Sequence, residues 1–195
     1  MPPAKRSAML TAVLDACVLY PVHLRDFLLN LAKRESFVPF WSERIRDEWI
    51  HNLLQNRHDI MPESLERTRL NMNIHFPNAL VCGYESLIPT LWLPDTDDLH
   101  VFAVAIHAKA KYIVTFNLDD FPASALQPYG IEAVLPDEIV LRVIRKAPQL
   151  VLQVAKGHRQ NLTRPPKTVD EYLATLEKQG LAKTVAFLRE LESDI

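Results

Sequence analysis

Short apolar runs alternate with amphipathic segments along the first two thirds of the chain. The runs are rich in Val, Ile, Leu and Phe and are bounded by polar or turn residues, which is the pattern of buried strands. They lie at 9–15, 37–41, 79–84, 112–116 and 130–135. Between them apolar positions recur at helical spacing, and we predict helices at 22–35, 43–53, 62–75, 98–106 and 122–126.

Strands that alternate with helices pair in parallel, and the helices cover both faces of the sheet. The first 135 residues are therefore predicted to form a three-layer α/β/α domain around a central parallel sheet. From Pro136 onward the pattern is only helical, interrupted by Pro165 and Pro166. The predicted helices are 136–145, 148–159, 168–178 and 181–192. We expect a domain of residues 1–135 and a C-terminal all-helical extension of residues 136–195.

The amino-acid composition and the spacing of the cysteines indicate which class of protein this is. An apolar content of 48% and a charged content of 24% are ordinary for a folded globular chain. Cys17 and Cys82 have neither disulfide nor zinc spacing, which favours the reducing cytoplasm. The apolar stretch after Lys5 and Arg6 is interrupted by Asp15 and is too short for a membrane span. We expect a cytoplasmic protein without a membrane segment.

Acidic residues stand where the predicted strands end. Asp15 closes the first strand, Asp119 and Asp120 follow the strand at 112–116, and Asp97 and Asp98 start a helix. Binding sites of parallel sheets form at the carboxyl ends of the strands, so these acids can converge. Glu48 lies on the helix after Ser42, next to its apolar face, and can point partly toward the same place.

Several clustered carboxylates stay ionised only with compensation, because like charges raise one another's pKa. A hard divalent cation supplies this compensation through oxygen ligands. Such a site suits phosphodiester hydrolysis, since the cation polarises the phosphate and stabilises the attacking and leaving oxygens. Taken singly, each acid has a simpler explanation as a turn residue, a helix N-cap or a solvated helix residue.

Two segments resemble the second half of PIN-domain proteins. They are Leu93-Pro-Asp-Thr-Asp-Asp-Leu-His-Val-Phe-Ala-Val-Ala-Ile and Tyr112-Ile-Val-Thr-Phe-Asn-Leu-Asp-Asp-Phe-Pro122. Val13-Leu-Asp-Ala16 and the stretch from Ser42 to Glu48 match the first half in order and spacing. The resemblance covers residues 9–135, and the helical tail resembles the extension of one VapC-like subgroup.

The resemblance implies a ribonuclease that uses Mg²⁺ or Mn²⁺, with four acids as metal ligands and catalytic residues: Asp15, Glu48, Asp98 and Asp120. Thr115 and Asn117 would support them, and the roles of the neighbours Asp97 and Asp119 stay open. Many PIN proteins are toxins of the VapC type, so the resemblance also implies an RNA substrate, a cognate antitoxin protein and a homodimer.

Charge is unevenly distributed, because residues 1–135 hold 12 Lys/Arg against 16 Asp/Glu while residues 139–169 hold basic residues and no acid. Lys and Arg bind RNA phosphates, but the same residues can form a solvated helical face. The candidate RNA contacts are Arg44, Arg142, Arg145, Lys146, Lys156 and Arg159.

Two other functions fit parts of the pattern. A PIN-fold module that binds RNA or protein without catalysis would keep the fold, and a magnesium-binding receiver-like phosphoacceptor would share the sheet. The receiver needs an acid pair at the first strand end, but Ala16 and Cys17 follow Asp15. His100 is interpreted as a histidine on the helix surface, and Trp41, Trp49 and Trp92 as core residues.

Overall fold

The computed structural model describes residues 9–163 and 165–195, and the predicted α/β architecture is confirmed. A four-stranded parallel sheet in the order β2-β1-β3-β4 forms its centre. The strands are β1 (Leu10–Leu14), β2 (Phe37–Phe40), β3 (Tyr112–Val114) and β4 (Glu132–Val134). Since β1 and β3 are central neighbours, their carboxyl ends lie side by side.

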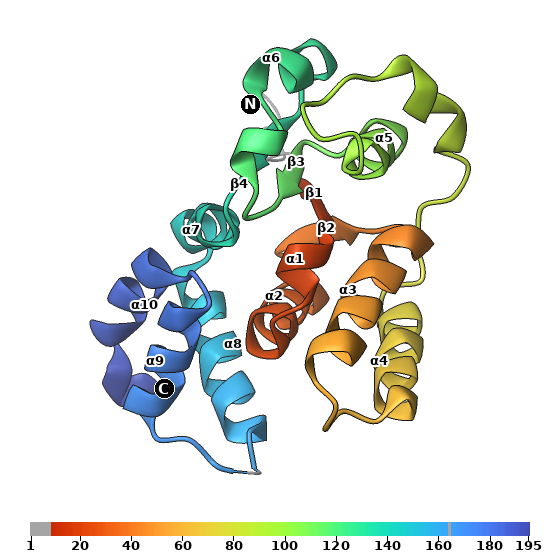
Figure 1. The fold of residues 1–195 in the computed structure, drawn as a ribbon. Helices are drawn as coiled ribbons and strands as arrows, with labels where there is room; N and C mark the ends of the chain where they lie inside the picture. The colour runs from red at the N-terminus through yellow and green to blue at the C-terminus, as the bar shows by residue number, and fades with distance from the viewer. Residues whose placement is uncertain (1–8, 164) are drawn as a thin grey trace, which may run out of the picture.

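Helices cover the sheet, with α2 packed on β2 and α5 packed on β1 and β3 (Figure 1). The helices that accompany the sheet are α1 (Ala16–Leu19), α2 (Val22–Lys33), α3 (Glu43–Asn56), α4 (Pro62–His75), α5 (Leu99–His107) and α6 (Ala123–Leu126). Short 3₁₀ turns lie at Glu85–Thr90, Leu118–Asp120 and Gln127–Tyr129. The turn at Leu118–Asp120 places its acids directly beyond the end of β3.

The predicted strand at 79–84 is wrong. Only Leu80 forms a bridge there, with Trp41, and the backbone hydrogen bonds join Trp41 to Ala79 and Val81. Gly83 has a φ of +79°, which ends an extended backbone, so pairing stops after one bridge. Trp41 and Trp49 are fully buried as predicted, whereas Trp92 is 65% exposed and is not a core residue.

The C-terminal part is helical, as predicted. Its helices are α7 (Pro136–Lys146), α8 (Pro148–Asn161), α9 (Val169–Lys178) and α10 (Ala182–Arg189), followed by a 3₁₀ turn at Glu192–Asp194. The α8 helix packs on α2 (Figure 1). The buried apolar residues of both parts form one continuous core. A membrane-spanning helix is not found in the described ranges, 9–163 and 165–195.

Candidate active site

Asp15 stands where β1 ends and α1 begins. Its side chain caps α1 by accepting the Ala16 N–H at 2.6 Å, and it accepts the Thr115 hydroxyl at 2.7 Å. The Cys17 thiol donates to the same carboxylate at 3.1 Å. Asp15 is buried, and its neighbour Thr115 follows β3, so the pairing of β1 with β3 brings the two residues together. The position of the Asp15 carboxylate is therefore fixed by three donors.

The Cys17 side chain makes polar contacts beside Asp15. It is partly exposed, lies 3.5 Å from the Thr115 hydroxyl and accepts the Phe116 N–H at 3.4 Å. Burial and the charge of Asp15 raise the pKa of the Cys17 thiol to about 12. The residue stays protonated near neutral pH and keeps its role as a donor to Asp15.

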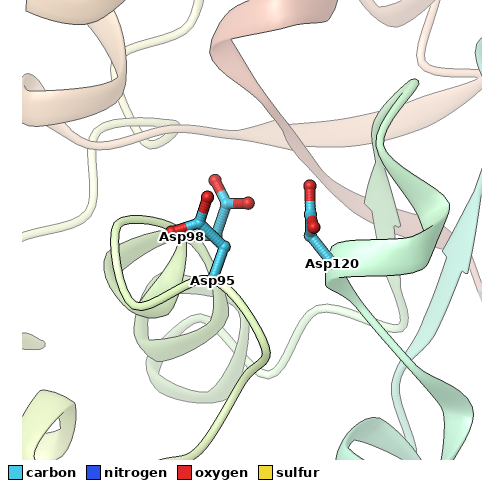
Figure 2. A group of neighbouring side chains, drawn as sticks. All are labelled: Asp95, Asp98 and Asp120. Carbon is cyan, nitrogen blue, oxygen red and sulfur yellow. The ribbon is translucent and has the colours of Figure 1, made fainter.

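Three further carboxylates meet beside this edge of the sheet. Oxygen atoms of Asp95, Asp98 and Asp120 lie within 4.8 Å of one another, and Figure 2 shows two loops bringing them together. Asp95 and Asp98 come from the loop that enters α5, and Asp120 comes from the 3₁₀ turn after β3. Asp98 occupies the N-cap of α5 without a side-chain capping bond, so its carboxylate is free to face the others.

The charges of the cluster act on one another. Burial, together with the charges of Asp15, Asp120 and Asp95, raises the pKa of Asp98 to about 6. Asp15 stands at the end of β1, the strand that pairs with β3, and Asp120 lies in the turn that follows β3. No ion pair with a basic residue forms at Asp95, Asp98 or Asp120 in the part of the chain that the structure describes.

Glu48 approaches from α3, a helix whose N-terminus is capped by the Ser42 hydroxyl. Its carboxylate contacts Nε2 of His100 at 3.0 Å and Nε of Arg44 at 3.2 Å. Burial raises the pKa of Glu48, but the bonds and charges of His100 and Arg44 outweigh it, so the pKa lies below its usual value. The interpretation of His100 as a surface histidine is wrong, because its side chain is 1% exposed.

The structure brings the sequence candidates together unevenly. Asp98 and Asp120 share the cluster, the charge of Asp15 acts on Asp98, and Glu48 is joined to the first turn of α5 through His100. Asp97 and Asp119 are exposed and lie outside the cluster, and Asn117 donates its backbone N–H to Thr115 at 3.0 Å. Asp95 was missed, although its place three residues before Asp98 in an acid-rich loop is a signal for it.

The candidate RNA contacts are largely engaged within the chain. Arg44 bonds Glu48 and the Asp97 carbonyl, Lys156 bonds the Asp194 carbonyl, and Arg159 bonds the carbonyls of Lys167 and Ile195. Arg145 and Lys146 remain exposed at the end of α7. Arg164, also in the basic stretch, lies outside the described residues.

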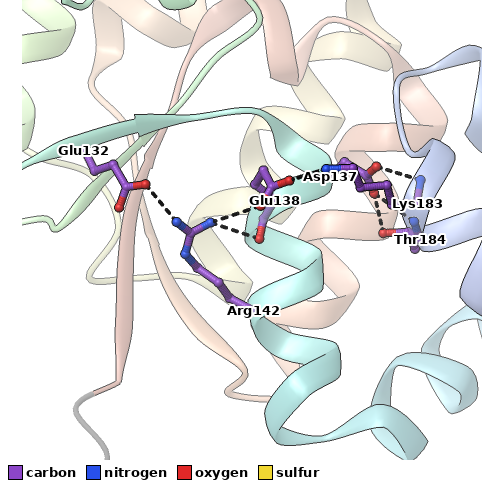
Figure 3. Close-up of polar contacts among 6 residues, drawn as sticks. All are labelled: Glu132, Asp137, Glu138, Arg142, Lys183 and Thr184. Atoms are coloured by element: carbon purple, nitrogen blue, oxygen red, sulfur yellow. Dashed lines mark hydrogen bonds and ion pairs between the residues drawn. The ribbon is translucent and has the colours of Figure 1, made fainter. Parts of the chain in front are cut away.

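Ion pairs and hydrogen bonds tie the extension to itself and to the sheet (Figure 3). Buried Asp137 accepts the backbone N–H groups of Lys183 and Thr184 at 2.8 and 2.9 Å and the Thr184 hydroxyl at 2.6 Å. It thus caps α10 from α7. Arg142 pairs with Glu132 at 2.8 Å, which connects α7 to β4.

The extension also contacts the segment that follows β3. Gly180, in the turn between α9 and α10, has a φ of +89°, and a Cβ placed there would lie 2.8 Å from Cε1 of Phe116. Phe116 directly follows Thr115, the residue that bonds Asp15. Gln179 accepts the Leu24 N–H at 2.6 Å, which fixes the same turn against α2.

Comparison with known families decides the classification. The PIN domain model matches residues 11–119, more than half of the chain. The chain belongs to the PIN domain family. A second model, the VapC50 C-terminal domain, matches residues 136–190 of this PIN protein and so covers most of the helical extension.

One curated relative is similar to this PIN protein over 101 residues at 35% identity. It is named "Putative ribonuclease VapC50" and comes from Mycobacterium tuberculosis. The match covers 52% of this chain and 59% of the relative, so the chain spans less than two thirds of that protein's length. No solved structure matches the chain. Because the chain belongs to the PIN domain family, the alternative of a receiver-like phosphoacceptor is not retained.

The residues of the cluster fit a divalent cation. Three carboxylates within 4.8 Å offer only oxygen donors, the ligands that Mg²⁺ and Mn²⁺ prefer. Burial and the charges of neighbouring carboxylates raise the pKa of Asp98, and a bound cation would relieve this charge imbalance.

Proposed function

We propose that this PIN protein is an endoribonuclease that requires Mg²⁺ or Mn²⁺ and hydrolyses phosphodiester bonds of RNA. The observation that carries the proposal is the cluster of Asp95, Asp98 and Asp120, three carboxylates without a basic partner among the described residues, beside buried Asp15. Close carboxylates that lack a cationic partner destabilise a fold, so a site of this kind points to a ligand. The name of the mycobacterial relative supports RNA as the substrate.

Each acidic residue would have a role set by its position in the site. Asp95, Asp98 and Asp120 would hold the cation, with Asp15 beside them, held in place by Thr115 and Cys17. A bound divalent cation would neutralise these carboxylates and stabilise the negative charge that develops on the scissile phosphate. Glu48 would ligate the cation or orient the attacking water. Its lowered pKa keeps the Glu48 carboxylate ionised near neutral pH, as either role requires.

Cleavage of labelled single-stranded RNA tests the proposal. The purified protein should cut RNA with Mg²⁺ or Mn²⁺ and lose activity in EDTA. Asp98→Asn should lower the rate at least about 100-fold, since even residues that only support metal ligands cost about 10- to 100-fold. Asp170→Asn, on an exposed part of α9, is the matched control for an Asp-to-Asn change. Equal cleavage by Asp98→Asn and the control would refute the site.

The same assay separates the competing functions. Binding of RNA without cleavage under all metal conditions would identify a non-catalytic RNA-binding module. Cleavage of single-stranded DNA at the rate of RNA would assign the protein to nucleases without sugar specificity. The test needs both substrates at the same length and sequence.

We further propose that the protein is the toxin of a type II toxin–antitoxin pair, acts in the cytoplasm as a homodimer and is inhibited by a cognate antitoxin protein. The match of residues 136–190 to the VapC50 C-terminal domain supports this placement. Induced expression should arrest growth, while Asp98→Asn should not. An adjacent reading frame encoding the antitoxin should restore growth when co-expressed. Light scattering on the purified protein measures the dimer.

A further inference from the structure

Glu48 and the acid loop belong to different parts of the chain, and one buried contact joins them. Nε2 of His100, in the first turn of α5, lies 3.0 Å from Oε1 of Glu48 on α3. An ionised carboxylate only accepts hydrogen bonds, so His100 is the donor. His100 follows Asp98, the N-cap residue of α5, by two residues. The contact therefore connects Glu48 to the turn that carries the Asp98 carboxylate.

Arg44 also contacts Glu48, but this contact is weaker because it is exposed to solvent. It bonds Glu48 at 3.2 Å and the Asp97 carbonyl at 3.4 Å, but its side chain is 50% exposed. Exposed ion pairs contribute little, because water screens them and the long side chains lose entropy. A hydrogen bond from a buried donor to a charged acceptor is stronger and better fixed in direction. Of the two contacts, the one from His100 determines where the Glu48 carboxylate lies.

We infer that His100 is a positioning residue whose Nε2–H holds the Glu48 carboxylate to the first turn of α5, the helix at whose N-cap Asp98 stands. The inference rests on the proposed function and names a further residue for it. Nδ1 of His100 has no hydrogen-bond partner among the described residues. Only the Nε2 position is used, so a glutamine, whose amide nitrogen occupies nearly the same place, should replace the histidine. An asparagine, one methylene shorter, should not reach Glu48.

The test compares His100→Gln with His100→Asn, two variants that bring the same amide group into the same buried site. Both are made in the full chain, and circular dichroism melting confirms folding. Two quantities are measured: kcat and KM for RNA cleavage, and the Kd for Mn²⁺ by calorimetry without RNA. We expect His100→Asn to lose about 10- to 100-fold in kcat or Mn²⁺ affinity, the range for partners of metal ligands, with KM nearly unchanged. His100→Gln should stay within about threefold of the wild type.

A double-mutant cycle adds a second measure. In a Glu48→Ala background, His100→Asn should change neither quantity by more than about twofold, because its effect passes through Glu48. Full additivity of the two losses would overturn the inference. Equal values for wild type, His100→Gln and His100→Asn would also overturn it, as would an equal loss in both variants.

The test also gives a result if one of the His100 variants does not fold. If His100→Asn does not fold, His100→Gln decides alone: values within threefold of the wild type support the inference, and a tenfold loss refutes it. An unfolded His100→Gln refutes it as well, because the donor would then not suffice in this site. If the wild type binds Mn²⁺ but cleaves no RNA, the proposed function fails, while the Mn²⁺ affinities still judge His100.

Discussion

Two groups of acidic residues in this molecule differ in how their charge is met. At the junction of α7 and α10, Asp137 accepts three hydrogen bonds, and Glu138 contacts Lys183 at 2.9 Å (Figure 3). At the edge of the sheet, Asp95, Asp98 and Asp120 face one another without a basic partner in the described part of the chain (Figure 2). Hydrogen bonds and an ion pair within the protein compensate the charge of the first group. The described residues offer no such compensation to the second group.

The difference separates structural acids from functional ones. Satisfied carboxylates stabilise the fold, because each bond offsets the cost of removing the charge from water. Carboxylates that repel one another reduce stability, and such strain is typical of binding and catalytic sites. Neutralising an acid should therefore have opposite effects on stability in the two groups.

The largest effect is expected at the satisfied group. Asp137→Ala removes the cap of α10 and leaves two backbone N–H groups and a buried hydroxyl without their acceptor. The free energy of unfolding should fall by about 3 kcal/mol, from lost capping and unpaired buried donors. Urea unfolding measures it. Asp170→Ala is the control, since its exposed carboxylate pairs with Arg189, and a similar loss in both variants would show that Asp137 has no special role in stability.

The second largest effect is expected on Mn²⁺ binding, and it tests which acids belong to the cluster. Asp95 has a carboxylate oxygen in the cluster, whereas Asp97, two residues later in the same loop, does not. Asp95→Asn should weaken Mn²⁺ binding about tenfold or more, while Asp97→Asn should change it less than threefold. Calorimetry with Mn²⁺ gives both values. The reverse order would show that the cluster is assembled from the other acid of the loop.

A smaller effect is expected on stability at Asp98. Its pKa of about 6 exceeds the ordinary 3.8, so the folded state binds the proton more tightly than the unfolded state. The resulting penalty is absent below pH 3.8, grows between 3.8 and 6 and is complete above 6. In EDTA at pH 7.5, Asp98→Asn should stabilise the fold by about 1 kcal/mol, a value reduced for solvent screening. The two proteins should unfold alike at pH 3.5, and a destabilised variant at pH 7.5 would contradict the repulsion.

The smallest effect is expected at the edge of the satisfied group. Arg142 pairs with Glu132, whose side chain is 58% exposed, and lies over the ring of Tyr112. Glu132→Gln should cost less than about 1 kcal/mol, as exposed ion pairs do. Thermal melting at low and high salt measures it. A loss of stability as large as that of Asp137→Ala would mean that exposure does not determine how much each contact contributes.

The sequence could predict the architecture because short apolar runs mark the buried strands, while apolar residues at helical spacing mark the helices. It could also place Asp15 and Asp120 at strand ends, since that follows from the order of elements alone. His100 was misread because α5 is buried on nearly all sides, so no polar face in its pattern marks which side points outward. Asp95 was missed because a loop has no period, and only the three-dimensional turn brings it to Asp98.

Gly180 has a consequence for engineering. Its turn lies against Phe116, the residue after Thr115, so the C-terminal extension packs on the segment that supports Asp15. A split or shortened version that ends near residue 135 would expose the face of α2 that α8 covers and would leave Phe116 without its neighbour. Any attempt to use the nuclease region as a portable part, for instance fused to an RNA-binding module, should therefore carry the extension with it.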